Sequence, residues 1–344
     1  MARPDQPGSM TQHEEVVPIL DFGSQTAQLI ARRVREAGVY AVLVDPATRA
    51  EKLKAMAPKG IILSGGPASV YDENAPTMDP EVLSIGVPVL GICYGMQLAC
   101  RMLGAEVRPN SKREFGRAPM TRGPEPSSFL QAIPEKTSVW MSHGDQIESL
   151  AEAGFKTIAS TPTCPHAAVE RRAGDAVFLG VQFHPEVTHT PHGRDMLQNF
   201  LYEICGYAGS WRMADFATTA AETLRASIGD AHVICGLSGG VDSSVAAALL
   251  HRAIGDRLHC VFVDNGLLRK NERALVETTF RDHFKIDLRV VDASEAFLSD
   301  LAGVTDPQRK RKLIGARFVD VFRDAAKDIG GATHLAQGTL YPDV

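Results

Sequence analysis

Short apolar runs alternate with helical patterns along most of the chain, and this alternation constrains the fold more than any other feature. In the first half, Gly38 and Gly104 directly follow the helical patterns, as glycine often does at a helix C-terminus. Strands separated by helices predict a parallel sheet that is covered on both faces. Here the expected strands are 16–20, 41–44, 61–63, 87–92, 139–141 and 177–183, and the expected helices are 25–37 and 96–103.

A second alternation of the same kind begins after residue 215. The 344 residues are too many for one ordinary domain, and the segment 207–214, with its Gly and Ser residues, has the composition of a linker. We therefore expect a polar tail over 1–14, a first domain over 15–206 and a second over 215–344. In the second domain the expected strands are 232–236, 258–263, 288–292 and 334–336, and the expected helices are 242–254, 271–284 and 307–328.

Two regions depart from the alternating pattern. Between 110 and 134 several Pro and Gly residues interrupt it, which predicts loops or short antiparallel strands. The expected strand 334–336 runs into Gln337-Gly338-Thr339, and the sequence ends at Val344 without a helix to follow. An α/β sheet rarely ends just after a strand, so we expect the second domain to be incomplete.

Composition and charge exclude several classes of protein. Hydrophobic residues make up 44% and charged residues 22%, as in an ordinary globular protein. The formal net charge of −5 gives no field that would attract nucleic acid or an anionic membrane, and no apolar run is long enough to span a bilayer. The cysteines are scattered, which argues for a reducing compartment and predicts a cytoplasmic protein.

Residues 236–244, Gly-Leu-Ser-Gly-Gly-Val-Asp-Ser-Ser, have the character of a phosphate-binding loop between a strand and a helix. Adjacent Gly239 and Gly240 let backbone N–H groups approach an anion, and Ser243 and Ser244 stand at the positive end of the helix. No lysine follows the glycines, so this is not the common ATPase loop. The alternative is a glycine-rich turn without a ligand, but the length of the motif favours pyrophosphate binding.

Residues 91–95, Gly-Ile-Cys-Tyr-Gly, have the strand–turn–helix pattern of a nucleophile elbow with Cys93 at its tip. A thiol at a helix N-terminus has its thiolate stabilised, which makes it a competent nucleophile near neutral pH. An isolated cysteine is more often a small core residue. The partners of Cys93 therefore decide between these interpretations.

Those partners follow the strand 177–183. His184 can act as a base toward the thiol, and Glu186 can orient its ring, giving a Cys-His-Glu triad. The nearby His189 and His192 lack zinc-site spacing and are interpreted as loop residues. Backbone amides of Gly66 and Tyr94 are candidates for an oxyanion hole, although Gly65-Gly66 alone predicts only a tight turn.

Further motifs accompany these residues in a fixed order. In the first half they are Asp21-Phe22-Gly23-Ser24-Gln25, Ser64-Gly65-Gly66-Pro67, Gly91-Ile92-Cys93-Tyr94-Gly95-Met96-Gln97, Met141-Ser142-His143-Gly144-Asp145 and Val181-Gln182-Phe183-His184-Pro185-Glu186-Val187-Thr188-His189-Thr190. In the second half they are Leu237-Ser238-Gly239-Gly240-Val241-Asp242-Ser243-Ser244, Val261-Phe262-Val263-Asp264-Asn265-Gly266-Leu267-Leu268-Arg269 and Ala336-Gln337-Gly338-Thr339-Leu340-Tyr341-Pro342-Asp343. Together they resemble the glutamine-hydrolysing GMP synthase family. The resemblance implies a class I glutamine amidotransferase domain with a parallel, flavodoxin-like sheet, followed by an adenine-nucleotide α-hydrolase-like ATP-pyrophosphatase domain.

The resemblance also implies a reaction and its site residues. Cys93, His184 and Glu186 would hydrolyse glutamine, and the ammonia would convert adenylylated xanthosine monophosphate into GMP, while ATP becomes AMP and pyrophosphate. Mg²⁺ would neutralise the phosphates, with its protein ligands left unassigned. Glutamine would be bound by Gln97, Ser142 and His143, ATP by Ser238, Gly239, Gly240, Val241, Asp242, Ser243, Ser244, Val263 and Leu268, and the acceptor nucleotide by Arg311.

Family members continue well beyond the Tyr-Pro-Asp motif at 341–343, into a C-terminal domain through which they homodimerise. The chain is therefore expected to be truncated, with an intact glutaminase half. Three alternatives stay open: glutaminase activity alone, a two-domain ligase with another acceptor, and a regulatory partner of a full-length enzyme.

Overall fold

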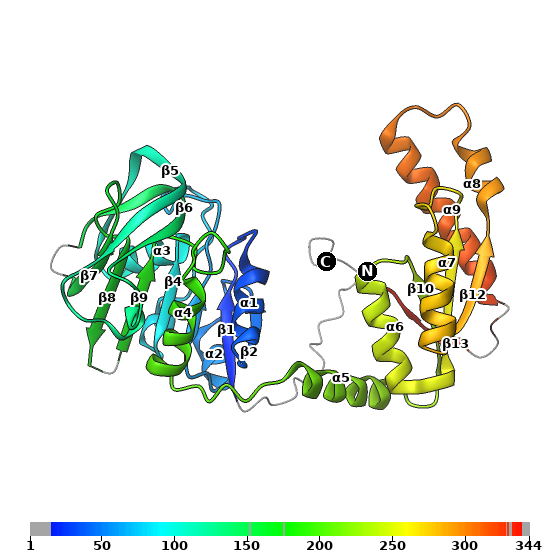
Figure 1. Cartoon of the computed structure of the whole chain (residues 1–344), viewed down its shortest axis with the longest axis horizontal. Coiled ribbons are helices and arrows are strands. Elements are labelled where there is room, and N and C mark those ends of the chain that lie inside the picture. The colour runs from blue at the N-terminus through cyan, green and yellow to red at the C-terminus, as the bar shows by residue number, and fades with distance from the viewer. Residues whose placement is uncertain (1–14, 151–152, 175, 328, 330–331, 339–344) are drawn as a thin grey trace. The chain divides into compact units, whose positions relative to one another are not determined.

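The computed structural model describes residues 15–150, 153–174, 176–327, 329 and 332–338. The chain divides into two compact units, Met1–Arg212 and Met213–Val344 (Figure 1). The division falls inside the segment 207–214 that the sequence suggests as a linker. Each unit has its own sheet and its own cores, as expected for two α/β domains.

Over the described residues, the first unit contains one sheet of nine strands in the order β2-β1-β3-β4-β9-β8-β7-β5-β6. From β2 to β9 neighbouring strands are parallel, in the order typical of flavodoxin-like folds, and from β9 to β6 they are antiparallel. The strands are β1 Val16–Leu20, β2 Tyr40–Val44, β3 Ile61–Leu63, β4 Val89–Ile92, β5 Glu106–Arg122, β6 Lys136–Ser149, β7 Phe155–Ser160, β8 Ala168–Ala173 and β9 Ala176–Val181.

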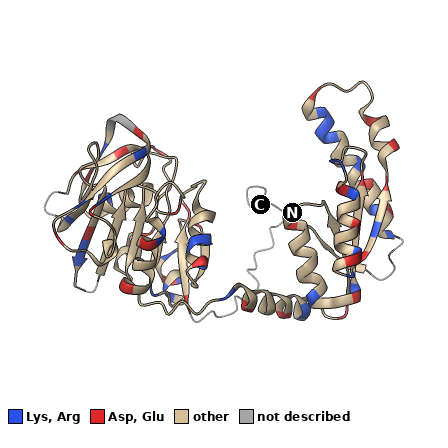
Figure 2. Cartoon of the chain, in the orientation of Figure 1, with Lys and Arg blue, Asp and Glu red and all other residues tan. Residues whose placement is uncertain are grey.

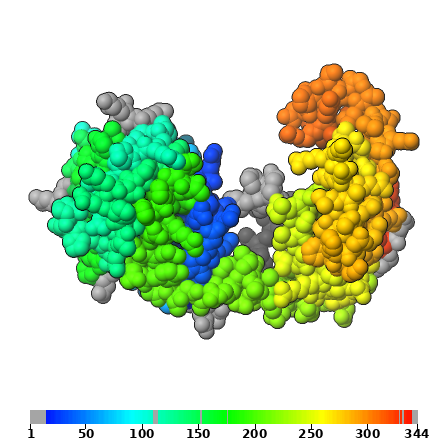
Figure 3. Space-filling view, in the orientation of Figure 1, coloured from blue at the N-terminus to red at the C-terminus, as the bar shows by residue number. Residues whose placement is uncertain are grey.

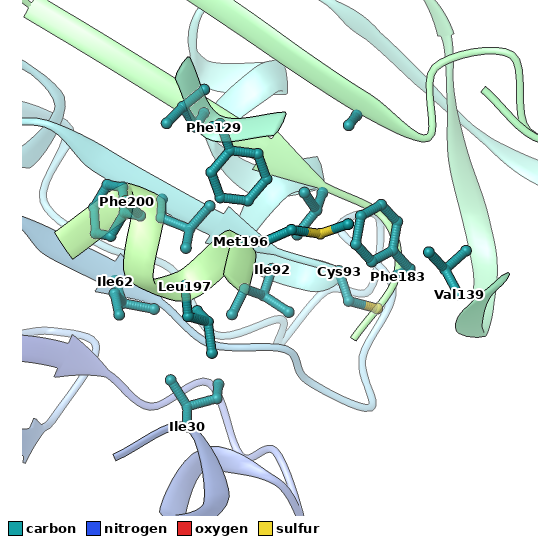
Figure 4. Close-up of a cluster of buried hydrophobic side chains, with 14 of the residues drawn as sticks. Ile30, Ile62, Ile92, Cys93, Phe129, Val139, Phe183, Met196, Leu197 and Phe200 are labelled. Atoms are coloured by element: carbon teal, nitrogen blue, oxygen red, sulfur yellow. The ribbon is translucent and has the colours of Figure 1, made fainter. Parts of the chain in front are cut away.

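Helices cover both faces of the parallel part of this sheet. One core joins it to α1 (Ala27–Glu36), α4 (Gly193–Gln198) and the π-helical turn Asn199–Ile204 (Figure 4). The other core joins it to α2 (Ala50–Ala55) and α3 (Tyr94–Met102). The expected strands and helices in this part of the chain are confirmed to within a few residues, although α2 and α4 were not anticipated.

The region 110–134 differs from its expected short strands and loops. It contributes to β5, a strand of 17 residues that pairs antiparallel with the 14-residue β6, and the expected strand 139–141 is only the middle of β6. Pairing between the two long strands provides hydrogen-bond partners for the backbone of β5 despite its Pro and Gly residues. The register of this pairing shifts between Pro109 and Glu114, as at a β-bulge. Buried residues such as Val139 and Met141 alternate with more exposed neighbours along β6. One side of this strand therefore faces the core.

Over the described residues, the second unit has a parallel sheet of four strands in the order β12-β11-β10-β13. Its strands agree with the expected ones and are β10 His232–Leu237, β11 Leu258–Asp264, β12 Asp287–Asp292 and β13 Ala332–Ala336. The helices are α5 Met213–Ile228, α6 Val241–Ile254, α7 Glu272–Glu277, which continues as the π-helical turn Thr278–His283, α8 Ser294–Leu301 and α9 Pro307–Lys327. The end of α8 and the start of α9 project from the body of this unit (Figures 1 and 3).

Among the residues that the structure describes, no helix is both long enough and apolar enough to cross a membrane.

Tyr207, near the end of the first unit, is hydrogen-bonded to β1 and to the residues just before β3. The side chain is buried, and its hydroxyl accepts hydrogen bonds from the amides of Lys59 and Gly60, both at 3.0 Å, and donates to the Val16 carbonyl at 2.7 Å. Residue 207 therefore packs as part of the first unit.

We expect Tyr207→Phe to destabilise the first unit by about 2–4 kcal/mol, because it leaves buried amides without an acceptor. Tyr202→Phe is the matched control. The Tyr202 hydroxyl donates only to the Ala37 carbonyl, so its loss should cost about 1 kcal/mol. Both tryptophans, Trp140 and Trp211, lie in the first unit, so urea unfolding followed by tryptophan fluorescence reports on it alone. Equal losses in the two variants would contradict the role given to Tyr207.

Candidate functional site

Cys93 occupies a strained turn between β4 and α3. Its backbone has φ 49° and ψ −107°, a conformation that residues other than glycine rarely adopt. The turn is tightly packed, since a Cβ on Gly91 would lie 2.8 Å from Met96 Cα and one on Gly95 would lie 2.6 Å from the Leu63 carbonyl oxygen. The sequence pattern of a nucleophile elbow is therefore matched by the backbone geometry of one.

His184 follows β9 and lies against Cys93. Its Nδ1–H donates to Glu186 Oε1 at 2.7 Å, and its ring is also hydrogen-bonded to the Cys93 side chain. Burial disfavours a charged ring. The hydrogen bonds to Cys93 and Glu186, with their charges, outweigh it and raise the pKa of His184 to about 10. Glu186 is fully buried, and its Oε2 has no hydrogen-bond partner among the described residues, so the imidazolium is its main partner.

The loop after His184 is fixed by contacts from three elements. The Thr190 hydroxyl donates to the His184 carbonyl at 2.7 Å and accepts from the Trp140 amide of β6 at 3.0 Å. Arg33 of α1 donates from Nε to the Glu186 carbonyl at 3.0 Å. A Cβ on Gly193 would lie 1.9 Å from the Pro185 carbonyl oxygen, so this close approach requires glycine.

The two other histidines of this loop point elsewhere. His189 packs on the Trp140 ring with 4.4 Å between centroids, and His192 pairs with Asp195 at 3.1 Å. Within the described ranges, no cluster of three or more His, Cys, Asp or Glu side chains could hold a metal ion.

The segment Ser64–Gly66 lies directly beside the Cys93–His184 pair. A Cβ on Gly65 would lie 3.2 Å from His184 Cε1, and one on Gly66 would lie 3.3 Å from Tyr94 Cγ. Tyr94 is the first residue of α3, where amides have no acceptor within the helix. The structure thus brings both candidate oxyanion-hole residues to the side of the thiol.

The three residues expected to bind glutamine surround the same thiol. Ser142 accepts from Cys93 Sγ through its carbonyl at 3.5 Å. His143 is buried beside it, with Nδ1 3.0 Å from the Asp145 carbonyl and Nε2 3.4 Å from Glu114, and burial lowers the pKa of His143. Gln97 is also buried, and its Nε2 is committed to protein acceptors, the Asp145 carbonyl and a neighbouring glutamine.

That neighbouring glutamine, Gln182, was missed by the sequence reasoning as a site residue. It is fully buried, and its Nε2 donates to Cys93 Sγ at 3.7 Å while its Oε1 accepts from Gln97 Nε2 at 3.1 Å. The available signal was a single polar residue inside the apolar run 177–183, two positions before His184.

In the second unit, the loop 238–240 joins β10 to α6. The Ser243 hydroxyl lies 3.1 Å from the Ser238 hydroxyl and donates to the Gly240 carbonyl at 3.1 Å, and the Ser244 hydroxyl donates to the same carbonyl at 2.7 Å. Gly239 has φ 76°, which favours glycine. The loop is thus folded on itself, and the first-turn amides of α6 have no acceptors within the helix.

The other expected residues of the second unit are spread around this loop. Asp242 is exposed in the first turn of α6, and Leu268 lines a cavity of about 410 Å³ beside α7. Val263 is buried in the core, so only its backbone is available to a ligand. Arg311 is exposed in the basic first turns of α9 (Figure 2). The structure brings Gly338 close to the loop, since a Cβ there would lie 3.4 Å from the Ser243 amide.

Comparison with known proteins gives matches for both units. The family described as glutamine amidotransferase class-I matches residues 18–204, and the tRNA methyl transferase HUP domain matches residues 231–299. Curated relatives named glutamine-hydrolysing GMP synthase include one from Acetivibrio thermocellus, 51% identical over 332 residues, and one from Macrococcus caseolyticus, 50% identical over 335 residues. They cover 96% and 97% of this chain, which spans 64% of the length of each. A solved glutamine amidotransferase from Thermotoga maritima is 19% identical, covers 56% of this chain and 98% of its own, and has a TM-score of 0.43.

The charge balance around His184 gives a direct prediction. Glu186→Gln should lower the pKa of His184 well below about 10, because it removes the negative charge that helps hold the proton. The measurement is a pH titration of the ring nitrogens by NMR. Asp195→Asn, which removes the carboxylate beside the half-buried His192, is the matched control and should leave the pKa of His184 unchanged. An unaltered His184 titration in Glu186→Gln would contradict the assignment.

The same shift sets a pH window for stability. The folded pKa of about 10 lies above the ordinary value of roughly 6.5, so the proton on His184 stabilises the fold fully below about pH 6.5. This contribution is lost as the pH rises toward about 10.

Proposed function

Because the chain belongs to the class I glutamine amidotransferase family, we propose that its first unit hydrolyses glutamine to glutamate and ammonia at Cys93. The observation that carries this proposal is the buried His184 ring, hydrogen-bonded on one side to Cys93 and on the other to Glu186. A charged imidazole beside a thiol at a strained turn is the arrangement that an activated cysteine needs.

In the proposed reaction, His184 carries the proton at the start, and the Cys93 thiolate attacks the side-chain amide carbon of glutamine. Backbone amides of Gly66 and Tyr94 receive the negative charge that develops on the carbonyl oxygen. His184 then protonates the amide nitrogen, which departs as ammonia and leaves a glutamyl thioester on Cys93. Water attacks the thioester, His184 takes its proton, and glutamate is released as the thiolate re-forms.

The surroundings of the thiol support a division of roles among the remaining residues. Glu186 holds the His184 ring in one orientation and balances its charge. We assign Ser142 and His143 to the wall of the glutamine site, since they lie beside the thiol on β6. Gln97 would contribute through its contacts with the protein, because its Nε2 is already committed to protein acceptors.

The curated relatives, of whose length this chain spans 64%, support a synthetic reaction that uses the ammonia. ATP would adenylylate O2 of xanthosine monophosphate, and ammonia would displace AMP at C2 to give GMP. In this chain, the loop Ser238–Ser244 would hold the departing pyrophosphate through backbone amides and hydroxyls. Leu268 and the backbone of Val263 would contact adenosine, and Arg311 would contact the acceptor nucleotide.

Three further features belong to this proposal. Magnesium would neutralise the phosphates of ATP, because the loop Ser238–Ser244 supplies few formal charges of its own. The scattered cysteines support a cytoplasmic location. Homodimerisation is proposed from the resemblance, because full-length members of the family homodimerise.

The glutaminase proposal is tested by Cys93→Ala. This variant should release no ammonia from glutamine above background, because it lacks the sulfur that forms the thioester. Glutamate formation measured by a coupled assay gives the readout, and Cys100→Ala is the matched control, since burial raises the pKa of the Cys100 thiol and leaves it inert. Normal hydrolysis by Cys93→Ala would exclude the mechanism.

Two separate variants, Asp242→Ala and Gly239→Ala, test the proposed binding of ATP. Gly239 has φ 76°, so a side chain there would strain the loop, and its Cβ would lie 3.3 Å from Glu272 Oε1. Both variants should weaken ATP binding, measured by calorimetry, and leave glutamine hydrolysis at the wild-type rate. If ATP binds Gly239→Ala as tightly as wild type, the loop is not the phosphate site.

A further inference from the structure

We propose that Gln182 is a catalytic residue of the first unit, whose side-chain amide donates a hydrogen bond to the Cys93 sulfur and favours the thiolate. This inference rests on the proposed hydrolysis of glutamine at Cys93. Gln182 directly follows β9, and its Nε2 lies 3.7 Å from Cys93 Sγ. The Ser142 carbonyl, 3.5 Å from the same sulfur, can accept from the thiol but cannot stabilise a thiolate. Among the residues that the structure describes, the side chains that can donate to the thiolate are therefore His184 and Gln182.

The direction of the Gln182 amide is fixed by a chain of hydrogen bonds that starts at a backbone carbonyl. The Asp145 carbonyl can only accept, so the Gln97 atom at 2.7 Å from it must be Nε2. The second hydrogen of that nitrogen points to Gln182, 3.1 Å away, so the Gln182 atom that it meets must be Oε1. The remaining end of the Gln182 amide, which faces the sulfur, is then the NH₂ group. Gln97 is accordingly a positioning residue, which acts on the sulfur through Gln182.

The chain is held in a dry and rigid setting. Gln182 is 0% exposed and Gln97 3% exposed, so water cannot replace either amide. Asp145 is anchored from a second side, because its Oδ2 accepts from the Ser69 hydroxyl at 2.5 Å. In a buried site a hydrogen bond to a charged atom is stronger than in water, so one N–H group aimed at the sulfur has a large effect.

The hydrogen bond matters at two stages of the proposed reaction. Before the attack, with the proton on His184, Gln182 stabilises the negative charge on the Cys93 sulfur. The charge moves to the substrate oxygen as the carbon–sulfur bond forms, and the Gln182 contact weakens. When water has added to the thioester, the carbon–sulfur bond breaks, and Gln182 again stabilises the departing thiolate. No oxidant or further reactant is needed.

The experiment measures the pH dependence of Cys93 alkylation by iodoacetamide, read at the Cys93 peptide by mass spectrometry. Alkylation requires the thiolate but no glutamine hydrolysis, so it tests this inference separately from the proposed function. Gln182→Met keeps the approximate volume and removes the donor, and should raise the alkylation midpoint by about one pH unit, a tenfold loss of thiolate below the midpoint. Gln97→Met should raise it by less, because the Gln182 amide can then rotate.

Thr161→Val is the matched control. Thr161 is a buried residue of the same unit whose hydroxyl accepts from the Cys164 amide at 3.0 Å, and its loss should leave the midpoint unchanged. A folded Gln182→Met protein with the wild-type midpoint would overturn the proposal, as would an equal shift in Thr161→Val.

A second measurement on the wild-type chain covers the case in which Gln182→Met does not fold. The side-chain amide resonances of Gln182 should shift through the alkylation midpoint, and that shift should be absent in Cys93→Ala. Amide resonances that stay constant through the midpoint would overturn the proposal as well.

Discussion

The strained backbone at Cys93 is the constraint on which the rest of the first unit depends. Cys93 has φ 49° although it carries a side chain, and the backbone on both sides of it is closely packed at Gly91 and Gly95. The Cys93 amide donates to the Val181 carbonyl at 2.7 Å, which ties the turn to the end of β9. His184 and Gln182 follow that strand end. This one backbone hydrogen bond therefore places the Cys93 thiol next to His184 and Gln182, the side chains that can stabilise its thiolate.

The first unit surrounds this thiol with buried polar groups that satisfy one another. A charge on His184 costs free energy in the interior, and Glu186 and the Cys93 sulfur offset that cost. The second unit is built differently. Its loop 238–244 contains mainly glycines and serines at a helix start and no basic residue, so anion binding would rely on backbone amides and the helix dipole. Substitutions in the first unit are accordingly expected to change the proposed hydrolysis through lost side-chain contacts. In the second unit, a substitution such as Gly239→Ala is expected to weaken anion binding by changing the backbone conformation.

Much of this arrangement could be predicted from the sequence, and the omissions have physical reasons. The strands 16–20, 61–63 and 258–263 are short apolar runs with clear limits, so their pattern alone defined them. The length of β5 was not predicted, since the sequence indicated only loops or short antiparallel strands there. Pairing with β6, a contact between distant segments, outweighs its Pro and Gly residues. The Cys93–His184–Glu186 set was recognisable from motif spacing. Gln182 was not, because its role depends on which end of its amide faces the sulfur, and a hydrogen-bond chain through Gln97 decides that.

The central claim is that the buried Cys93 sulfur forms a covalent bond to the glutamyl group. Rapid acid quenching of the protein during turnover of glutamine, followed by mass spectrometry of its peptides, tests this most directly. The account predicts a glutamyl thioester on the peptide that contains Cys93, with greater accumulation when the water step is slowed. Steady release of ammonia with no adduct on Cys93, or with an adduct on another residue, would contradict it.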